Sequence, residues 1–448
     1  MLNRSRRVLE GHPGRVLLSM ALPMMLGVFG MVAFNLADTY FVGRLGTLPL
    51  AALSFTFPVV FVIASISMGL GIGTSSVVSR AIGASSREEV RDLTTSAVAL
   101  AVIVVTFFAA VGFIFLDPVF RSLGAGPEVL PLIREYMTIW LVGMPFVVIP
   151  MVGNNAIRAT GDTTTPALVM LTAAGLNILL DPILIFGWGP IPALGIRGAA
   201  IATVFARATT LVVSLWVLAV RDKMLVLRLP RRAVLLDAWK RVAFVGVPAA
   251  ATQLITPVSL GIVTRLVAGF GTAAVAAFGV ASRIETFSLA FVQALGSVST
   301  PFFGQNFAAG NRDRLLTATR WATVYAVGWG AVLYAAVLVA GEALAAIFTD
   351  DPKVARIVVR YLVIVAGSYG LQGLVLFGAS AFNGLNLPLR AATVALVRLF
   401  VVYIPLALVF RALFGLSGIF WGAFGANVCA GLLAFVWTRR TVAEVPAG

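Results

Sequence analysis

The chain has 448 residues, of which 60% are hydrophobic and 11% are charged, and its mean hydropathy is +1.00. A soluble globular protein is usually about half apolar and about a quarter charged, so this composition excludes a soluble domain and predicts a polytopic membrane protein. The net charge of +15 at pH 7 does not indicate a nucleic-acid partner, because most basic residues lie between apolar runs, where they orient a membrane protein.

Long apolar runs, separated by Gly, Pro and charged residues, divide the chain into predicted membrane spans. A helix needs about 20 mostly apolar residues to cross a bilayer. By this criterion we expect an all-α protein with twelve transmembrane helices, at residues 16–42, 50–78, 93–116, 129–157, 166–187, 195–220, 241–267, 274–303, 315–341, 354–382, 391–412 and 416–438.

The basic residues are distributed unevenly among the connections. The even-numbered connections and both chain ends hold most of them, such as Arg80, Arg87 and Arg91 after the second predicted helix. Because cytoplasmic segments carry the excess of Lys and Arg, we expect both termini in the cytoplasm. This orientation also predicts an even number of spans in the inner (plasma) membrane.

The two halves of the chain resemble one another. Pro23 matches Pro248 and Gly46 matches Gly271, and both 248 − 23 and 271 − 46 are 225. One ungapped offset across several helices is not expected by chance. Two further matches, the second at an offset of 220 after a shorter connection, are Ser85 with Gly310 and Gly195 with Gly415.

This repeat predicts two pseudo-symmetric six-helix lobes. We expect an N-terminal lobe at residues 1–225 with helices 1–6, a cytoplasmic linker at 226–240 and a C-terminal lobe at 241–448 with helices 7–12. Both lobes begin on the same side and have an even number of spans. Their symmetry axis is therefore expected along the membrane normal.

Two acids lie inside predicted spans of the first lobe. Asp38 follows Asn35 by one turn, and Asp181 follows Asn177 by four residues on one helical face. An ionisable residue inside a membrane is costly and indicates a functional site by default. The matching helices of the second lobe carry no acid, which favours a site specific to the first lobe. The structural alternative is a buried acid that pairs with Arg or caps an irregular backbone.

Neighbouring residues extend this candidate site. Pro182 has no N–H, so the carbonyl of Ile178 loses its usual helical partner; Pro182 is a candidate hinge, although membrane helices also use proline for ordinary bends. Thr203 could add a hydroxyl, and small hydroxyl residues otherwise serve packing. Arg207, one turn later, is either a partner for an acid or a side chain that extends to the membrane surface.

Other polar residues in the spans are candidates to line a substrate cavity. Their alternative role is hydrogen bonding between helices. Glu285 lies within the eighth predicted helix, where it could contact a cationic substrate. The candidates are Asn154, Asn155, Gln253, Glu285 and Gln293.

Four motifs together resemble the multidrug and toxic compound extrusion (MATE) family, over nearly the whole chain. They are NLADTYFVGRLG at residues 35–46, NNAIRATGDTTTPAL at 154–168, LNILLDPILIFGWGP at 176–190 and GIRGAAIATV at 195–204. The acids on the first and fifth helices suggest the DinF-like branch. The NorM-like branch carries an acid on the seventh helix, where this chain reads ITPVS, and this difference argues against a sodium site in the second lobe.

The resemblance implies a function and roles for the site residues. It implies a V-shaped transporter that opens inward and outward and exports organic, often cationic or amphipathic, compounds. It also implies a cation or proton site formed by Asp38, Asn177 and Asp181, with Thr203 as the match for a family threonine. Asn35 is a further candidate for this site.

We therefore expect a cation-coupled multidrug antiporter that works by alternating access. Protons are favoured as the coupling ion, because desolvation and like-charge repulsion disfavour two ionised carboxylates in one cavity. Sodium at Asp38, Asn177 and Asp181 is the alternative. We expect no cofactor and no other metal, a monomer in the lipid bilayer, small-molecule substrates and no nucleic-acid partner.

Two other functions are less favoured by the sequence. A lipid or lipid-linked precursor flippase of the same superfamily is less favoured, because such relatives have extra spans and a more basic cavity. A membrane-embedded enzyme is less favoured still. His12 lies in the N-terminal tail and Cys429 is the single cysteine, so neither histidine catalysis in the membrane nor a cysteine metal cluster is expected. There is also no P-loop to indicate an ATP-driven transporter.

Overall fold

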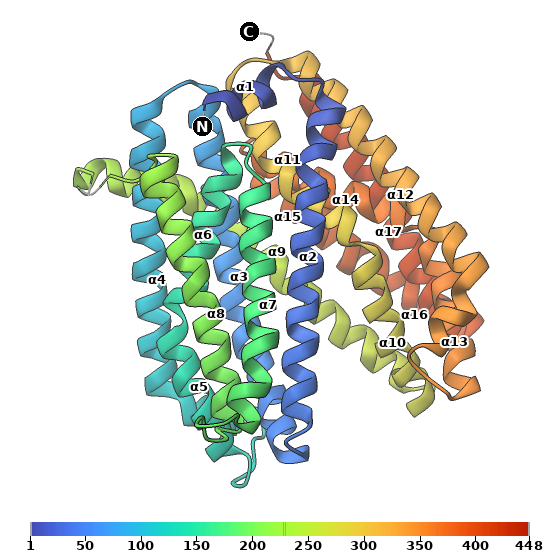
Figure 1. The fold of residues 1–448 in the computed structure, drawn as a ribbon. Helices are drawn as coiled ribbons and strands as arrows, with labels where there is room; N and C mark the ends of the chain where they lie inside the picture. Colours follow the sequence, from blue (N-terminus) through green and yellow to red (C-terminus); the bar gives the residue numbers. More distant parts are fainter. Residues whose placement is uncertain (1, 227, 229, 447–448) are drawn as a thin grey trace. The chain divides into compact units, whose positions relative to one another are not determined.

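The computed structural model describes residues 2–226, 228 and 230–446, and in these ranges the chain is helical, with no strand longer than one isolated bridge between Trp188 and Ile191 (Figure 1). The helices are α1 (Leu2–Glu10), α2 (Pro13–Gly43), α3 (Thr47–Gly83), α4 (Arg87–Ser122), α5 (Leu130–Gly143), α6 (Pro145–Ala159), α7 (Thr164–Phe186), α8 (Ile196–Trp216) with the π-helix η1 (Val217–Arg221), α9 (Arg232–Ala268), α10 (Thr272–Ser288), α11 (Ala290–Ala308), α12 (Arg312–Ala346), α13 (Pro352–Ala366), α14 (Tyr369–Gly384), α15 (Pro388–Leu396) with the π-helix η2 (Val397–Tyr403), α16 (Ile404–Phe414) and α17 (Leu416–Ala443).

The helices confirm an all-α polytopic membrane protein. Among the described residues, nine helical segments are long and apolar enough to cross a membrane, and three further pairs of helices are bent at a short break. The bends are 42° between α5 and α6, 48° between α10 and α11, and 57° between α13 and α14. If each bent pair crosses once, the protein has twelve spans, as the sequence predicts.

Some helix limits differ from those expected. The helix α1 was not predicted, because it is short and mostly polar. The helix α9 begins at Arg232, so residues 232–240, which the sequence assigned to the linker, are helical. Several spans are also longer than their apolar core, since their first and last turns are polar.

The backbone repeats the pattern found in the sequence. Gly46 and Gly271 precede α3 and α10 with φ of 121° and 96°. Gly195 and Gly415 precede α8 and α17 with φ of 56° and 62°. Residues that correspond in the internal repeat therefore have the same uncommon positive φ at the start of corresponding helices. Two more such pairs with positive φ are Ser85 with Gly310 and Gly161 with Asn386.

The chain forms two compact units whose limits differ from the expected lobes. Unit 1 is Leu26–Ala250, and unit 2 is Leu2–Met25 with the described residues from Ala251 onward. Both limits fall inside continuous helices, α2 and α9. The first half of α2 therefore belongs to unit 2, and the first half of α9 belongs to unit 1. For example, Arg241 of α9 pairs with Glu89 of α4 at 2.9 Å within unit 1.

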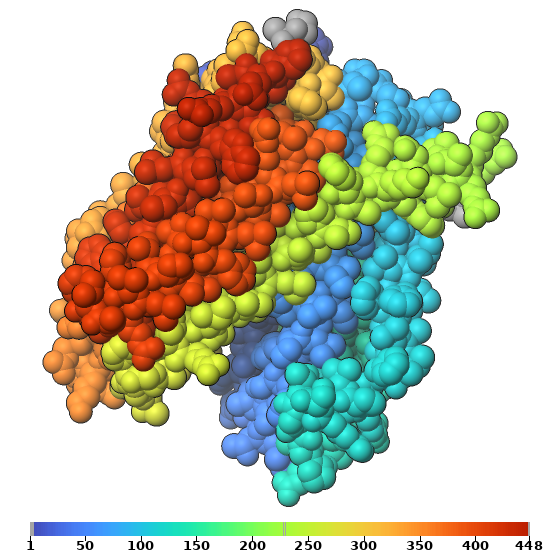
Figure 2. Space-filling model, turned by 180° about the vertical axis from the view of Figure 1, so that it is seen from behind, coloured from blue at the N-terminus to red at the C-terminus, as the bar shows by residue number. Residues whose placement is uncertain are grey.

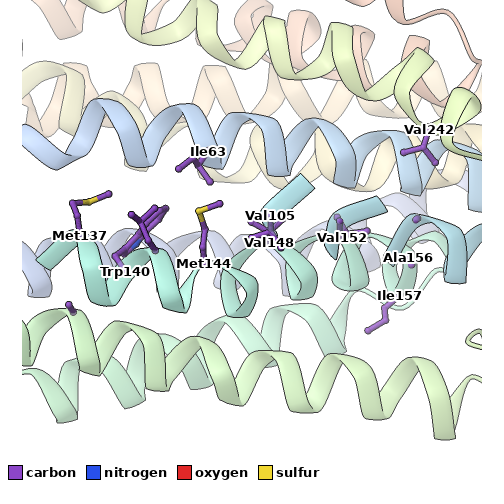
Figure 3. Close-up of a cluster of buried hydrophobic side chains, with 14 of the residues drawn as sticks. Ile63, Val105, Met137, Trp140, Met144, Val148, Val152, Ala156, Ile157 and Val242 are labelled. Carbon is purple, nitrogen blue, oxygen red and sulfur yellow. The ribbon is translucent and has the colours of Figure 1, made fainter. Parts of the chain in front are cut away.

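The core of unit 1 follows the bent pair α5 and α6. Met137 and Trp140 of α5 and Met144, which lies between α5 and α6, are buried, and Val148 and Val152 continue the row along α6 (Figure 3). Side chains from α3, α4 and the first half of α9 close over this row (Figure 3). This apolar core holds the spans that carry the polar residues described below.

Unit 2 has its own core, built on α11, α14 and α17. Phe382 of α14 packs against Trp437 of α17, with ring centroids 5.6 Å apart. The helices α16 and α17 lie side by side (Figure 2). Within the same unit, Arg314 of α12 donates hydrogen bonds to the carbonyls of Val8 and Gly11, which fixes α1 against α12.

The last two spans of each repeat cross at a glycine. A Cβ at Gly198 of α8 would overlap the carbonyl of Leu184 in α7, and a Cβ at Gly418 of α17 would overlap the carbonyl of Phe410 in α16. Only glycine allows the two backbones to approach so closely. In unit 1 this crossing brings α7 and α8 together (Figure 1), and both carry candidate site residues.

Candidate functional site

A buried polar cluster lies between α7 and α8. The amide Nδ2 of Asn177 donates to Oδ1 of Asp181 at 3.1 Å and lies 3.5 Å from Oγ1 of Thr203. Asn177 and Asp181 are fully buried, and Thr203 is nearly so. The four-residue spacing on α7 and the close crossing with α8 therefore bring three of the predicted site residues together.

The helix α2 adds the second carboxylate. Asp38 is only 8% exposed and is close enough to Asp181 for an electrostatic interaction. Glycines on α2 allow this approach to α7, since a Cβ at Gly30 would lie 2.9 Å from Cδ2 of Leu171. Unit 1 therefore brings Asp38 close to Asp181, and a shared functional role of the two acids remains a prediction.

Tyr136 of α5 is a member of the site that the sequence analysis missed. It is buried and interacts electrostatically with both Asp38 and Asp181. Its phenol can donate or accept a hydrogen bond. A tyrosine in an apolar run is ordinary in a membrane helix, so no pattern in the sequence distinguishes it from a packing residue.

Three acceptor oxygens of this cluster have no hydrogen-bond partner within residues 2–226, 228 and 230–446. They are Oδ1 of Asp38, Oδ1 of Asn177 and Oδ2 of Asp181. Among the described residues neither carboxylate forms an ion pair, so these acids are not neutralised by an arginine. Buried acceptors without donors are costly. The arrangement can therefore accept a proton, or a hard cation that takes oxygen ligands.

Two predicted members have other surroundings. Asn35 is exposed, and within the described ranges no hydrogen bond joins its side chain to the cluster; its carbonyl accepts from Thr39. The helix α7 continues without a break through Pro182 to Phe186. A hinge at Pro182 remains a prediction.

Two of the cavity candidates lie on α6. Oδ1 of Asn155 accepts from Arg158 at 2.5 Å, and its Nδ2 donates to the carbonyl of Met151 at 2.8 Å. Both ends of this side chain are therefore used inside unit 1, as the structural alternative requires. Oδ1 of Asn154, in contrast, is buried and has no hydrogen-bond partner in the described ranges.

Glu285 forms a separate network in unit 2. Its carboxylate accepts from the hydroxyl of Tyr361 at 2.5 Å and from Nε2 of Gln372 at 3.2 Å. Of the other two candidates in this unit, Gln253 is half-buried on α9 and Gln293 is exposed on α11.

The family model MatE matches the chain twice, at residues 23–183 and 248–409. The two matches begin 225 residues apart, since 248 − 23 is 225, which is the offset of the internal repeat. Together they cover well over half of the chain.

Individual transporters are also similar to this chain over nearly its whole length. A protein named FAD transporter from Shewanella oneidensis is 37% identical over 444 residues, which are 98% of this chain and 97% of that protein. The multidrug export protein MepA of Staphylococcus aureus is 26% identical over 434 residues, covering 94% of this chain and 92% of MepA. The crystal structure of the Vibrio cholerae MATE transporter VcmN in the bent form superposes with a TM-score of 0.90 at 31% identity, covering 98% of this chain and 99% of VcmN.

These comparisons confirm the family resemblance seen in the sequence and give the chain a transporter's role rather than an enzyme's. The DinF-like branch and the roles of single residues remain predictions. The chain belongs to the MATE family of multi-pass membrane transporters.

Proposed function

We propose that this protein exports organic compounds by antiport, driven by a cation that binds at Asp38, Asn177, Asp181 and Thr203. One observation carries the proposal: in the part of the chain that the structure describes, two buried carboxylates interact with each other, have no arginine or lysine partner, and leave acceptor oxygens without a hydrogen-bond donor. An ion that enters this site replaces the missing donors. The site is therefore more stable when it is occupied.

The coupling ion in this proposal is the proton. Two carboxylates removed from water and close together disfavour the state in which both are charged. A proton on one of them turns an unpartnered acceptor into a donor for the neighbouring oxygens. Sodium is the alternative, because the same cluster offers only oxygen ligands. Among the described residues, no group of three or more His, Cys, Asp or Glu side chains could hold a metal ion, so a tightly bound transition metal is not part of the proposal.

The substrates are proposed to be drug-like organic compounds. MepA, which is similar over most of its length, is named a multidrug export protein. The second candidate is the export of an organic anion such as a flavin nucleotide. It is favoured by the 37% identity to a protein named FAD transporter, higher than the 26% identity to MepA.

The membrane setting proposed here is the plasma membrane, with both termini in the cytoplasm. The excess of basic residues in the even-numbered connections supports this orientation. Labelling of single cysteines at the two ends in intact cells tests it: a thiol reagent that cannot cross the membrane should leave both ends unmodified. Labelling from outside would reverse the orientation.

Reconstitution into proteoliposomes tests the coupling. A proton gradient should drive uptake of a fluorescent organic cation in sodium-free buffer. A requirement for sodium, with no response to the proton gradient, would replace the proton by sodium. Movement of a labelled lipid between leaflets, with no transport of the soluble compound, would favour the flippase alternative.

A further inference from the structure

Arg207 is a cation that the coupling site does not use. It lies on α8, one helical turn after Thr203, inside a predicted span. Its Cζ lies 4.9 Å from the centroid of the Phe34 ring, over the ring face. Phe34 is buried on α2, one turn before Asp38. The pair of Arg207 and Phe34 thus forms the layer next to the carboxylate site, one turn away on both helices.

The charge of Arg207 is not neutralised by an acid. Within the described residues, no carboxylate forms an ion pair with its guanidinium. The sequence left two roles open, a partner for an acid or a side chain that reaches the membrane surface. The ring contact supports neither, because the guanidinium lies on a buried phenylalanine inside unit 1.

The position on α8 shows which way Arg207 faces. Thr203, Ala206 and Thr210, on the same side of the helix, are buried, whereas Phe205 and Val212 are exposed. Arg207 itself is half-buried. The side chain therefore faces the interior side of unit 1, while the apolar residues of α8 face outward.

An unpaired cation within a span is costly, and its presence there indicates a function that uses the charge. A guanidinium matches a carboxylate or a phosphate through two parallel N–H donors in its plane. Stacking on Phe34 occupies one face of that plane and leaves its edge free to donate. The ring thus fixes the orientation of the guanidinium without using its hydrogen bonds.

We propose that Arg207, held by Phe34, is an anion-binding subsite that takes the phosphate or carboxylate of an organic anion. The proposal rests on the second candidate under Proposed function, the export of an organic anion, and it names the residue that binds the anionic group, which the carboxylates could not attract. A phosphate of this kind can come from a soluble compound or from a lipid headgroup.

Equilibrium binding to the full-length protein in nanodiscs tests the subsite. Riboflavin and riboflavin 5′-phosphate are suitable probes, because they share one ring system and differ by the phosphate. A charge-assisted hydrogen bond contributes about 1.5–3 kcal/mol, so the wild type should bind the phosphate form about tenfold or more tightly than riboflavin. Inorganic phosphate should displace the phosphate form and leave riboflavin bound.

Substitutions test whether Arg207 causes the tighter binding of the phosphate form. Arg207→Gln should bind both flavins with equal affinity. Arg207→Lys should keep part of the preference, because lysine keeps the positive charge but lacks the two parallel N–H donors of the guanidinium. Arg283→Gln is the matched control: Arg283 is an exposed arginine on α10 of unit 2, and its loss should leave the preference unchanged. The competition by phosphate needs no variant and so does not depend on the folding of any substitution.

The outcomes separate the explanations. Equal binding of the two flavins by the wild type, or an unchanged preference in Arg207→Gln, would overturn the proposal. A preference present in phosphatidylcholine discs and lost in phosphatidylglycerol discs would support the subsite and make the headgroup of an anionic lipid its occupant. No ion gradient is imposed, so a failure of ion-coupled transport would not alter this result.

Discussion

Replacing Asp38 by asparagine should separate ion coupling from folding. The asparagine has nearly the same size, but it cannot take up or release a proton. Because no described residue donates a hydrogen bond to Oδ1 of Asp38, the change removes no such bond at that atom. We expect the free energy of unfolding to change by less than about 1 kcal/mol, the scale of a single hydrogen bond. Thermal unfolding in detergent measures this.

The effect on transport should be much larger. A pH difference of one unit is equivalent to about 1.36 kcal/mol for each proton moved. If one proton is exchanged for one substrate, the wild type can accumulate substrate about tenfold in proteoliposomes at that pH difference. Asp38→Asn has no such coupling, and its accumulation ratio should stay near one. The membrane potential is clamped with equal potassium and valinomycin, so that only the pH difference drives uptake.

Asp117→Asn is the control for this experiment. Asp117 lies in α4 and pairs with Arg134 at 2.5 Å, away from the coupling cluster, so its loss should not reduce accumulation. If Asp38→Asn folds and still accumulates substrate in proportion to the pH difference, the coupling role of Asp38 is wrong. Asp181→Asn should fail in the same way as Asp38→Asn, since the two acids share one site.

Three further substitutions have expected outcomes. Gly198→Ala should lower the free energy of unfolding by about 1–3 kcal/mol, because the added methyl group overlaps the carbonyl of Leu184. Thermal unfolding measures this. In the control Gly279→Ala, the added methyl group meets nothing within 4 Å, so the free energy of unfolding should not fall in this way. Thr203→Val loses only a 3.5 Å contact, and the initial rate of proton-driven uptake should fall no more than about tenfold; complete loss would show that the hydroxyl is an essential ligand. Glu285→Gln should weaken competition by organic cations for transport and spare neutral compounds; equal effects on both would indicate a purely structural role.

The sequence was sufficient to locate the spans and the two acids. A helix that crosses a membrane needs about 20 mostly apolar residues, so the apolar runs of the sequence predict where the spans lie. Asp38 and Asp181 are recognisable because a carboxylate in an apolar run has a cost that must be met by its surroundings. Their partner Asn177 followed from helical spacing.

Other features depend on contacts that no local pattern contains. The bends near Met144 and Leu289 lie in apolar residues, so the hydropathy of each span reads as continuous. The unit limits inside α2 and α9 follow from which neighbours these helices pack against, not from their composition. Tyr136 belongs to the site only because α5 brings it near both acids. No local pattern predicts that Arg207 lies over Phe34 of another helix and forms no ion pair with a described residue.

The repeated backbone conformations have a consequence for the history of the chain. Gly46 and Gly271 share a backbone conformation with positive φ, whereas Asp38 corresponds to Val263, since 263 − 38 is 225. After a duplication, both copies kept the geometry of the turns, and one copy alone now carries the charge. A chimaera made of two first halves would therefore have the turns of both copies and two carboxylate clusters. Its ion-to-substrate stoichiometry should be twice that of the natural chain.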